Sequence, residues 1–137
     1  MEILVDFDGT CVTHAFPNIG RDIGAVPVLK DLVNAGHKLI LFSMRSDVEN
    51  VPSPEIDGMF TGTYLTDAVQ WFKDNDIPLY GINVNPTQHV WTKSPKAYGQ
   101  LIIDDISLGT PLIWPEGERP YVDWDKVRIY LEDLNIL

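Results

Sequence analysis

The sequence is poor in cysteine and has no long apolar segment. Cys11 is the only cysteine among 137 residues, so the chain cannot form an internal disulfide, as is usual in a reducing cytosol. No apolar run approaches the roughly 20 residues that a membrane-spanning helix requires, and no basic region precedes an apolar stretch at the N-terminus. We therefore expect a soluble, cytoplasmic protein.

Basic side chains are also scarce. The chain has 10 Lys and Arg against 20 Asp and Glu, which gives a net charge of −10. This charge repels the phosphate backbone of DNA or RNA and so disfavours a nucleic acid as an extended partner. A small phosphorylated substrate remains compatible with it, because a single site can be positive within an acidic protein.

Apolar periodicity indicates alternating strands and helices. Four short apolar runs are typical of buried strands: residues 3–6, 39–42, 79–84 and 101–103. Three segments have apolar residues at helical spacing: 25–33, 65–72 and 127–134. The alternation predicts one domain over residues 1–137, an α/β fold in which helices cover both faces of a mainly parallel sheet. This arrangement is a three-layer α/β/α sandwich.

The connecting segments are predicted to be less regular. Residues 11–24 read as a loop or a small flap and residues 47–62 as an irregular segment, because prolines and glycines interrupt both. Thr66 is a candidate N-cap for the second helix, and Asp123 can cap the last one. Residues 111–114 would form a short edge strand.

Three single side chains receive structural interpretations. His14 lies in the predicted flap and is interpreted as an exposed loop histidine, with contact to a substrate as the alternative. Trp71 falls off the apolar stripe of its helix, and Cys11 is expected to pack against the sheet. None of the three is assigned a role in chemistry.

Two carboxylates directly follow the first predicted strand. Residues 6–10 read DFDGT, so that Asp6 and Asp8 leave a buried strand together and enter a glycine turn. Crowding two negative charges costs several kcal/mol unless a cation or hydrogen bonds offset it. A lone pair of this kind is weak evidence, since acidic residues at strand ends are common, but it is compatible with a metal ion and phosphate chemistry.

Further polar groups follow two other predicted strands. Ser43 comes after residues 39–42, and Asp104 with Asp105 comes after residues 101–103. Ligands of open α/β sheets bind at the carboxyl ends of the strands, where these groups would meet. Carboxylates there could hold Mg²⁺ between a nucleophile and a phosphate, and a serine hydroxyl could bind a phosphoryl oxygen.

A lysine ammonium would complete the charge balance around a phosphate. Lys96 is the best candidate for this role, and Lys93 is the alternative. Arg45, two residues after Ser43, is a candidate second phosphate donor; an ion pair with Asp47 or Glu49 is the competing interpretation.

Four motifs, in their order along the chain, resemble the signatures of the haloacid dehalogenase-like hydrolases. They are residues 6–10, Ser43, Lys96 or Lys93, and the pair Asp104-Asp105. The resemblance covers roughly residues 2–110, and residues 96–109 are also similar to small bacterial and phage hydrolases. It implies a Rossmann-type core and a magnesium-dependent phosphatase that acts through an aspartyl phosphate.

The resemblance also implies a role for each motif residue. Asp6 would attack phosphorus and bind Mg²⁺, and Asp8 would act as general acid and then general base, with its backbone carbonyl on the metal. Ser43 and Lys96 would bind the phosphoryl group, with Gly9 and Thr10 as further phosphate contacts. Asp104 would complete the metal shell. Asp105 would bind the metal through water or orient the lysine.

The motif spacing leaves little room for a cap domain. Only 37 positions separate Asp6 from Ser43, and 53 separate Ser43 from Lys96. The resemblance therefore implies a member with a minimal cap or none. Such members act on large substrates or rely on a second copy of the chain to close the site.

Three other functions are alternatives to this phosphatase. A non-enzymatic phosphate- or metal-binding module on the same fold is one, and a nucleotide phosphatase is the alternative within the enzyme class. A phosphoacceptor receiver domain fails on the order of its motifs, since residues 83–85 contain no aspartate.

Overall fold

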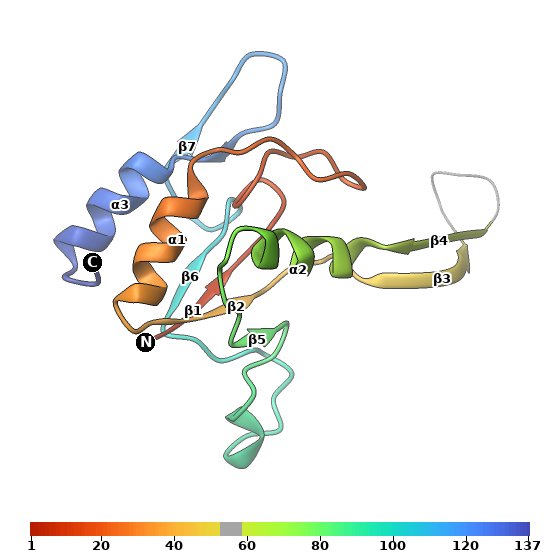
Figure 1. Cartoon of the computed structure of the whole chain (residues 1–137), viewed down its shortest axis with the longest axis horizontal. Helices are drawn as coiled ribbons and strands as arrows, with labels where there is room; N and C mark the ends of the chain where they lie inside the picture. Colours follow the sequence, from red (N-terminus) through yellow and green to blue (C-terminus); the bar gives the residue numbers. More distant parts are fainter. Residues whose placement is uncertain (53–58) are drawn as a thin grey trace.

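The computed structural model describes residues 1–52 and 59–137. It is an α/β structure built on a four-stranded parallel sheet with strand order β5-β2-β1-β6 (Figure 1). The strands of this sheet are β1 (Glu2–Val5), β2 (Lys38–Leu41), β5 (Gly81–Ile82) and β6 (Leu101–Ile103). The helices are α1 (Ala25–Asn34), α2 (Tyr64–Asp74), α3 (Trp124–Asp133) and the short 3₁₀ helix η1 (Gln88–Val90).

Strand register fixes where the functional residues meet. β1 lies between β2 and β6, and Val5 is in register with Leu41 and with Ile103. The three strands therefore end at the same level. Residues that follow them directly, among them Asp6 and Asp104, emerge at one edge of the sheet. This confirms the parallel sheet and the four predicted strands, although β5 is only two residues long.

The three helices share one hydrophobic core on one face of the sheet. Buried residues from β1, β2 and β6 pack there with buried residues of α1, α2 and α3. The other face carries a small cluster of Leu4, Ile40 and Ala97, with Phe42 and Tyr80 packed against it. Ala97 of this cluster belongs to the segment 83–100, which contains η1 and no α-helix. The three-layer α/β/α sandwich is therefore not confirmed.

Part of the segment predicted to be irregular forms a hairpin. β3 (Asp47–Pro52) pairs antiparallel with β4 (Met59–Thr63), and residues 53–58 of the predicted segment lie outside the described residues. The sequence did not predict β3 and β4, because polar residues, prolines and glycines are uncommon in strands. α2 begins at Tyr64 rather than after Thr66. The carboxylate of Asp47 in β3 accepts the backbone N–H of Thr66 at 2.9 Å.

The C-terminal region differs from the sequence prediction in the place of one strand and in the core face of α3. β7 (Leu112–Ile113) pairs with β8 (Tyr121–Val122) in a separate two-stranded sheet and is not an edge of the main sheet. Asp123 does cap α3, since its carboxylate accepts the backbone N–H of Lys126 at 3.2 Å. Tyr130 and Leu134, expected on the core face of α3, are exposed.

Two aromatic side chains of the core lie directly behind the first motif. Trp71 is half-buried against the core and packs edge-on against Phe7, with ring centroids 5.6 Å apart, so its predicted place off the apolar stripe is wrong. Trp124 is buried, and its indole N–H donates to the carbonyl of Thr10 at 2.7 Å. Cys11 is buried as expected. No helix in residues 1–52 or 59–137 is long and apolar enough to span a membrane.

Candidate active site

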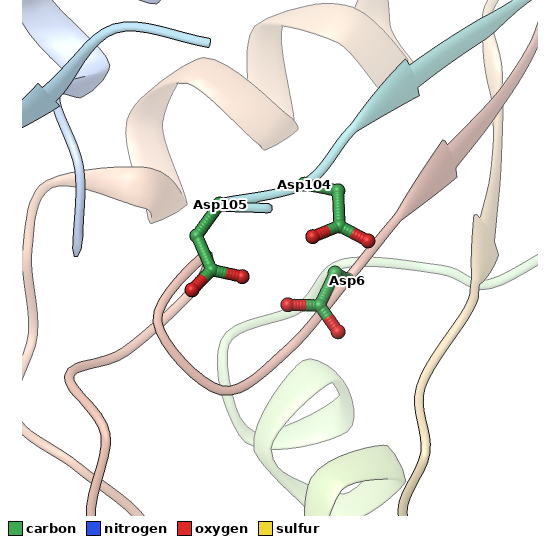
Figure 2. Close-up of side chains that lie close together, drawn as sticks. All are labelled: Asp6, Asp104 and Asp105. Atoms are coloured by element: carbon green, nitrogen blue, oxygen red, sulfur yellow. The ribbon is translucent and has the colours of Figure 1, made fainter. Parts of the chain in front are cut away.

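Three carboxylates converge at the carboxyl edge of the sheet. Asp6 follows β1, and Asp104 and Asp105 follow the neighbouring strand β6. One oxygen from each lies within 4.8 Å of the other two. Figure 2 shows the three side chains turned toward a common space. The parallel register of β1 and β6 produces this convergence, as the sequence predicted.

The cluster is electrostatically unfavourable without a cation. Burial, together with the negative charge of Asp104 and Asp105, raises the pKa of Asp6 to about 7, although a hydrogen bond from Thr10 acts in the opposite direction. Burial also raises the pKa of Asp104. A divalent cation would relieve this repulsion, and Mg²⁺ prefers hard oxygen ligands of this kind. The donor set therefore fits Mg²⁺.

Thr10 and Gly9 support the cluster from behind. The Thr10 hydroxyl donates to Asp6 Oδ2 at 2.8 Å and accepts the backbone N–H of Asp105 at 3.0 Å, so it links the ends of β1 and β6. The Gly9 N–H donates to the carbonyl of Val12. Both Thr10 and Gly9 are buried. The geometry gives these two residues a supporting position rather than the phosphate contact that we predicted.

Asp8 is held by a buried arginine. Arg45, whose side chain is 1 % exposed, donates from Nε and Nη2 to the two carboxylate oxygens of Asp8 at 2.7 and 2.8 Å. Its other N–H groups donate to the carbonyls of Pro17, Asn18 and Tyr64. All five donors of the guanidinium are thus used, which corrects both earlier interpretations of Arg45, as a phosphate donor and as the partner of Asp47 or Glu49.

Ser43 lies at the end of β2 on the pocket wall, as predicted. Its hydroxyl oxygen accepts the backbone N–H of Arg45 at 3.0 Å, and its own N–H donates to Asn83 Oδ1 at 2.8 Å. The hydroxyl proton has no acceptor among the described residues and can be donated to a phosphoryl oxygen.

The structure does not bring either predicted lysine to the site. Lys96 and Lys93 are exposed, and neither lines the pocket around the carboxylates. Both precede β6, in a segment that bonds to the amino ends of the strands: Gln100 N–H donates to the carbonyl of Glu2 at 2.9 Å. In Figure 1 this segment, with η1, lies below β5. The lysine prediction rests on the order of the motifs along the chain, and that order does not fix the path of the segment before β6, where the described residues form only the 3₁₀ turn η1.

Two further residues reach the site: His14, for which the sequence analysis favoured a structural interpretation, and Arg119, which it did not select. His14 Nε2 lies 2.9 Å from Asp105 Oδ2, and its side chain is 15 % exposed, so it is not the exposed loop histidine that we expected. Arg119, in the loop between β7 and β8, lines the same pocket. No motif or spacing marks either residue, because both come from irregular segments that the fold places over the strand ends.

The pocket is open and has a volume of about 660 Å³, within the range of small-molecule sites. Its acidic floor comes from the residues described above, and exposed apolar side chains contribute to its rim. The lining residues are Asp6, Asp8, His14, Phe16, Phe42, Ser43, Met44, Arg45, Asp104, Asp105, Ile106 and Arg119.

Comparison with known proteins identifies a relative of known structure. No protein-family model and no curated protein matches the sequence. A solved structure of a conserved protein from Bacteroides thetaiotaomicron matches 97 % of this chain and 90 % of its own length, with 32 % identity and a TM-score of 0.69. The chain belongs to the same family as this Bacteroides protein.

Proposed function

We propose that the chain is a magnesium-dependent phosphatase of the haloacid dehalogenase-like type, with Asp6 as nucleophile. One observation carries the proposal: carboxylates from the ends of two adjacent strands converge within 4.8 Å, in a pocket that also contains Asp8 and the Ser43 hydroxyl. The pocket thus contains candidates for the metal ligands, the nucleophile, the general acid and a phosphate donor. The order of these residues along the chain resembles three of the four signatures of that superfamily, all but the lysine, and supports the same reaction.

Asp6, Asp104 and Asp105 would hold Mg²⁺. When bound, the ion neutralises the negative charges of nucleophile and phosphate so that they can approach each other. Thr10 keeps the Asp6 carboxylate aligned with the backbone of Asp105 through its two hydrogen bonds. The Asp8 side chain is not part of the carboxylate cluster, because it is paired with Arg45. Any metal contact from Asp8 would therefore use its backbone carbonyl.

In the proposed reaction an Oδ atom of Asp6 attacks phosphorus. The bond between phosphorus and the ester oxygen breaks, and that oxygen takes a proton from Asp8. A water molecule then gives its proton to Asp8 and attacks the aspartyl phosphate. The bond to Asp6 breaks, and inorganic phosphate leaves. Arg45 holds Asp8 in place, and each Asp8 oxygen keeps a lone-pair site for this proton transfer.

The substrate class proposed here is a small phosphomonoester. The pocket volume of about 660 Å³ suits a metabolite-sized molecule, and the acidic charge of the chain disfavours a polynucleotide. Nucleotides are the alternative within this class. No cap is seen in the described residues, so we also propose that a second copy of the chain closes the site over this small substrate.

Release of inorganic phosphate tests the proposal. The substrates are p-nitrophenyl phosphate and a panel of phosphorylated metabolites, each with Mg²⁺ and with chelator, and Asp6→Asn is the matched variant. We expect release that requires Mg²⁺ and that Asp6→Asn loses. Residual activity of Asp6→Asn above a few per cent would rule out Asp6 as the nucleophile.

A phosphate- or metal-binding module is the second candidate. One observation favours it: neither Lys96 nor Lys93 lines the pocket, so the cation expected next to the phosphoryl group does not come from the predicted place. Phosphate binding without hydrolysis across the panel would support a binding module over an enzyme.

A further inference from the structure

We propose that Arg119 is the residue that binds the substrate's phosphoryl group, in the role expected of a lysine. The inference rests on the proposed phosphatase function and deepens it, because it assigns the phosphate-binding cation to the loop between β7 and β8. It also extends the site beyond the four sequence motifs, all of which end before that loop.

Arg119 lies where such a cation is needed. It lines the same pocket as Asp6, Asp8 and Ser43. Within residues 1–52 and 59–137, its guanidinium has neither a hydrogen-bond partner nor an ion-pair partner. Its donors are therefore available to a ligand. A planar guanidinium can offer two parallel N–H groups to a phosphate, which an ammonium group cannot do.

The other cations near the site are already engaged or lie elsewhere. Arg45 uses all five N–H groups on Asp8 and on three carbonyls. His14 contacts Asp105. Lys93 and Lys96 do not line the pocket. Of the two arginines that line the described pocket, Arg119 alone has N–H groups that are not bound by the described residues.

Charge balance shows why such a donor is required. Four carboxylates line the pocket, and the Arg45 guanidinium offsets one of them. A divalent metal would offset two more, so the pocket offers no excess positive charge to a dianionic phosphate, whether Asp8 is ionised or carries the proton that it transfers. Catalysis of phosphoryl transfer depends on cations that neutralise this charge. A guanidinium at the rim of the pocket would supply the missing positive charge.

Neighbouring contacts hold the Arg119 loop beside the site. Glu118 forms a two-point ion pair with Arg21 of the segment 11–24, at 2.6 and 3.2 Å. On the far side of the loop, the backbone N–H of Val122 in β8 donates to the carbonyl of Gly9 at 2.9 Å. Arg119 thus sits between two attachments to the polypeptide that carries Asp6 and Asp8.

The experiment compares Arg119→Ala and Arg119→Lys with Lys96→Ala and Lys93→Ala. Two quantities are measured in Mg²⁺: kcat/KM for p-nitrophenyl phosphate, and the affinity of the full chain for inorganic phosphate by calorimetry. Arg119 and both lysines are exposed, so all four variants should fold. Circular dichroism and the melting temperature verify this.

We expect Arg119→Ala to lower kcat/KM by about 10²- to 10³-fold, as loss of a donor to a reacting oxyanion does. It should also weaken phosphate binding, and Arg119→Lys should recover part of both losses because it keeps the charge. Lys96→Ala and Lys93→Ala should stay within about twofold of the unmodified chain, since surface cations this far from the phosphate contribute little.

The outcomes separate this inference from the proposed function. If the unmodified chain hydrolyses the substrate and Arg119→Ala stays within a few-fold of it, Arg119 has another role while the phosphatase proposal stands. If nothing is hydrolysed, the phosphatase proposal fails, and the affinity for inorganic phosphate tests the assignment of Arg119 by itself. A loss of phosphate affinity confined to the Arg119 variants supports that assignment. Phosphate binding that is absent, or unchanged in Arg119→Ala, overturns it.

Discussion

The guanidinium of Arg45 binds both carboxylate oxygens of Asp8, at 2.7 and 2.8 Å, while its remaining N–H groups bind three backbone carbonyls. Two of those carbonyls belong to the segment 11–24, and the third is that of Tyr64, the first residue of α2. The proposed general acid is thus fixed by the same side chain that joins the end of β2 to the segment over the site. Arg45 therefore holds Asp8 in position with all of its N–H groups bound by the protein.

This arrangement makes Arg45 much more important for stability than a surface arginine. Arg45→Ala leaves the Asp8 carboxylate and the three carbonyls without their donor, and breaking a buried pair in this way costs about 3–5 kcal/mol. We expect a loss of that size in the free energy of unfolding, measured by urea denaturation. Arg45→Lys keeps the charge but not the two-point geometry, so its free energy of unfolding should lie between those of the unmodified chain and Arg45→Ala.

Arg128→Ala is the matched control for Arg45→Ala. Arg128 also lies 2.7 Å from a carboxylate, that of Asp31, but this pair is partly exposed. Its removal should cost less than about 1 kcal/mol, because water screens exposed ion pairs. Similar losses for the two variants would contradict the structural role assigned to Arg45.

A second prediction concerns Asp6 and pH. Its pKa is raised from 3.8 to about 7 in the folded chain, mainly by burial. Between these values the folded chain binds more protons than the unfolded chain, so this group lowers stability as pH rises through the interval. In chelator, Asp6→Asn should therefore have a higher melting temperature than the unmodified chain at pH 8, and nearly the same melting temperature at pH 4.

Magnesium provides the complementary measurement. If Asp6, Asp104 and Asp105 hold the ion, Mg²⁺ at pH 8 should raise the melting temperature of the unmodified chain more than that of Asp6→Asn, since binding to the folded state stabilises it. An Asp6→Asn variant that is no more stable than the unmodified chain at pH 8 in chelator would refute the electrostatic account of this cluster.

The acidic cluster and Ser43 could be predicted from the sequence because each follows a buried strand directly. A short apolar run identifies a strand of a parallel sheet, and parallel strands that share a register end together. The positions of Asp6, Asp104 and Ser43 therefore required only the strand assignments, which the structure confirms. This part of the site could be predicted because each residue is placed by the strand that precedes it in the sequence.

The cation could not be predicted in the same way. Lys96 was placed at the site by the order of the motifs alone, and nothing in the sequence of residues 83–100 indicates that this segment turns at the amino ends of the strands. Arg119 and His14 reach the pocket from irregular segments. Tertiary contacts such as Glu118 with Arg21 place those segments, and such contacts leave no periodic signal.

The third prediction uses two glycines with similar backbone conformations. Gly9 and Gly36 both have positive φ, 80° and 91°, so alanine at either position should cost about 1–2 kcal/mol of backbone strain. A Cβ at Gly36 would have nothing within 4 Å, whereas one at Gly9 would collide with the side chains of His14 and Asp105. Gly9→Ala should therefore destabilise the chain more than Gly36→Ala, as measured by urea denaturation.

The difference between these two variants should extend to the metal. To make room for a Cβ at Gly9, the side chains of His14 and Asp105 must move, and Asp105 is one of the three proposed ligands. Displacing the support of a metal ligand lowers affinity by about 10- to 100-fold. We expect a loss in this range for Mg²⁺ with Gly9→Ala and no change with Gly36→Ala, both by calorimetry. Equal affinities in the two variants would mean that Asp105 does not hold the metal, which would then be bound by Asp6 and Asp104 without it.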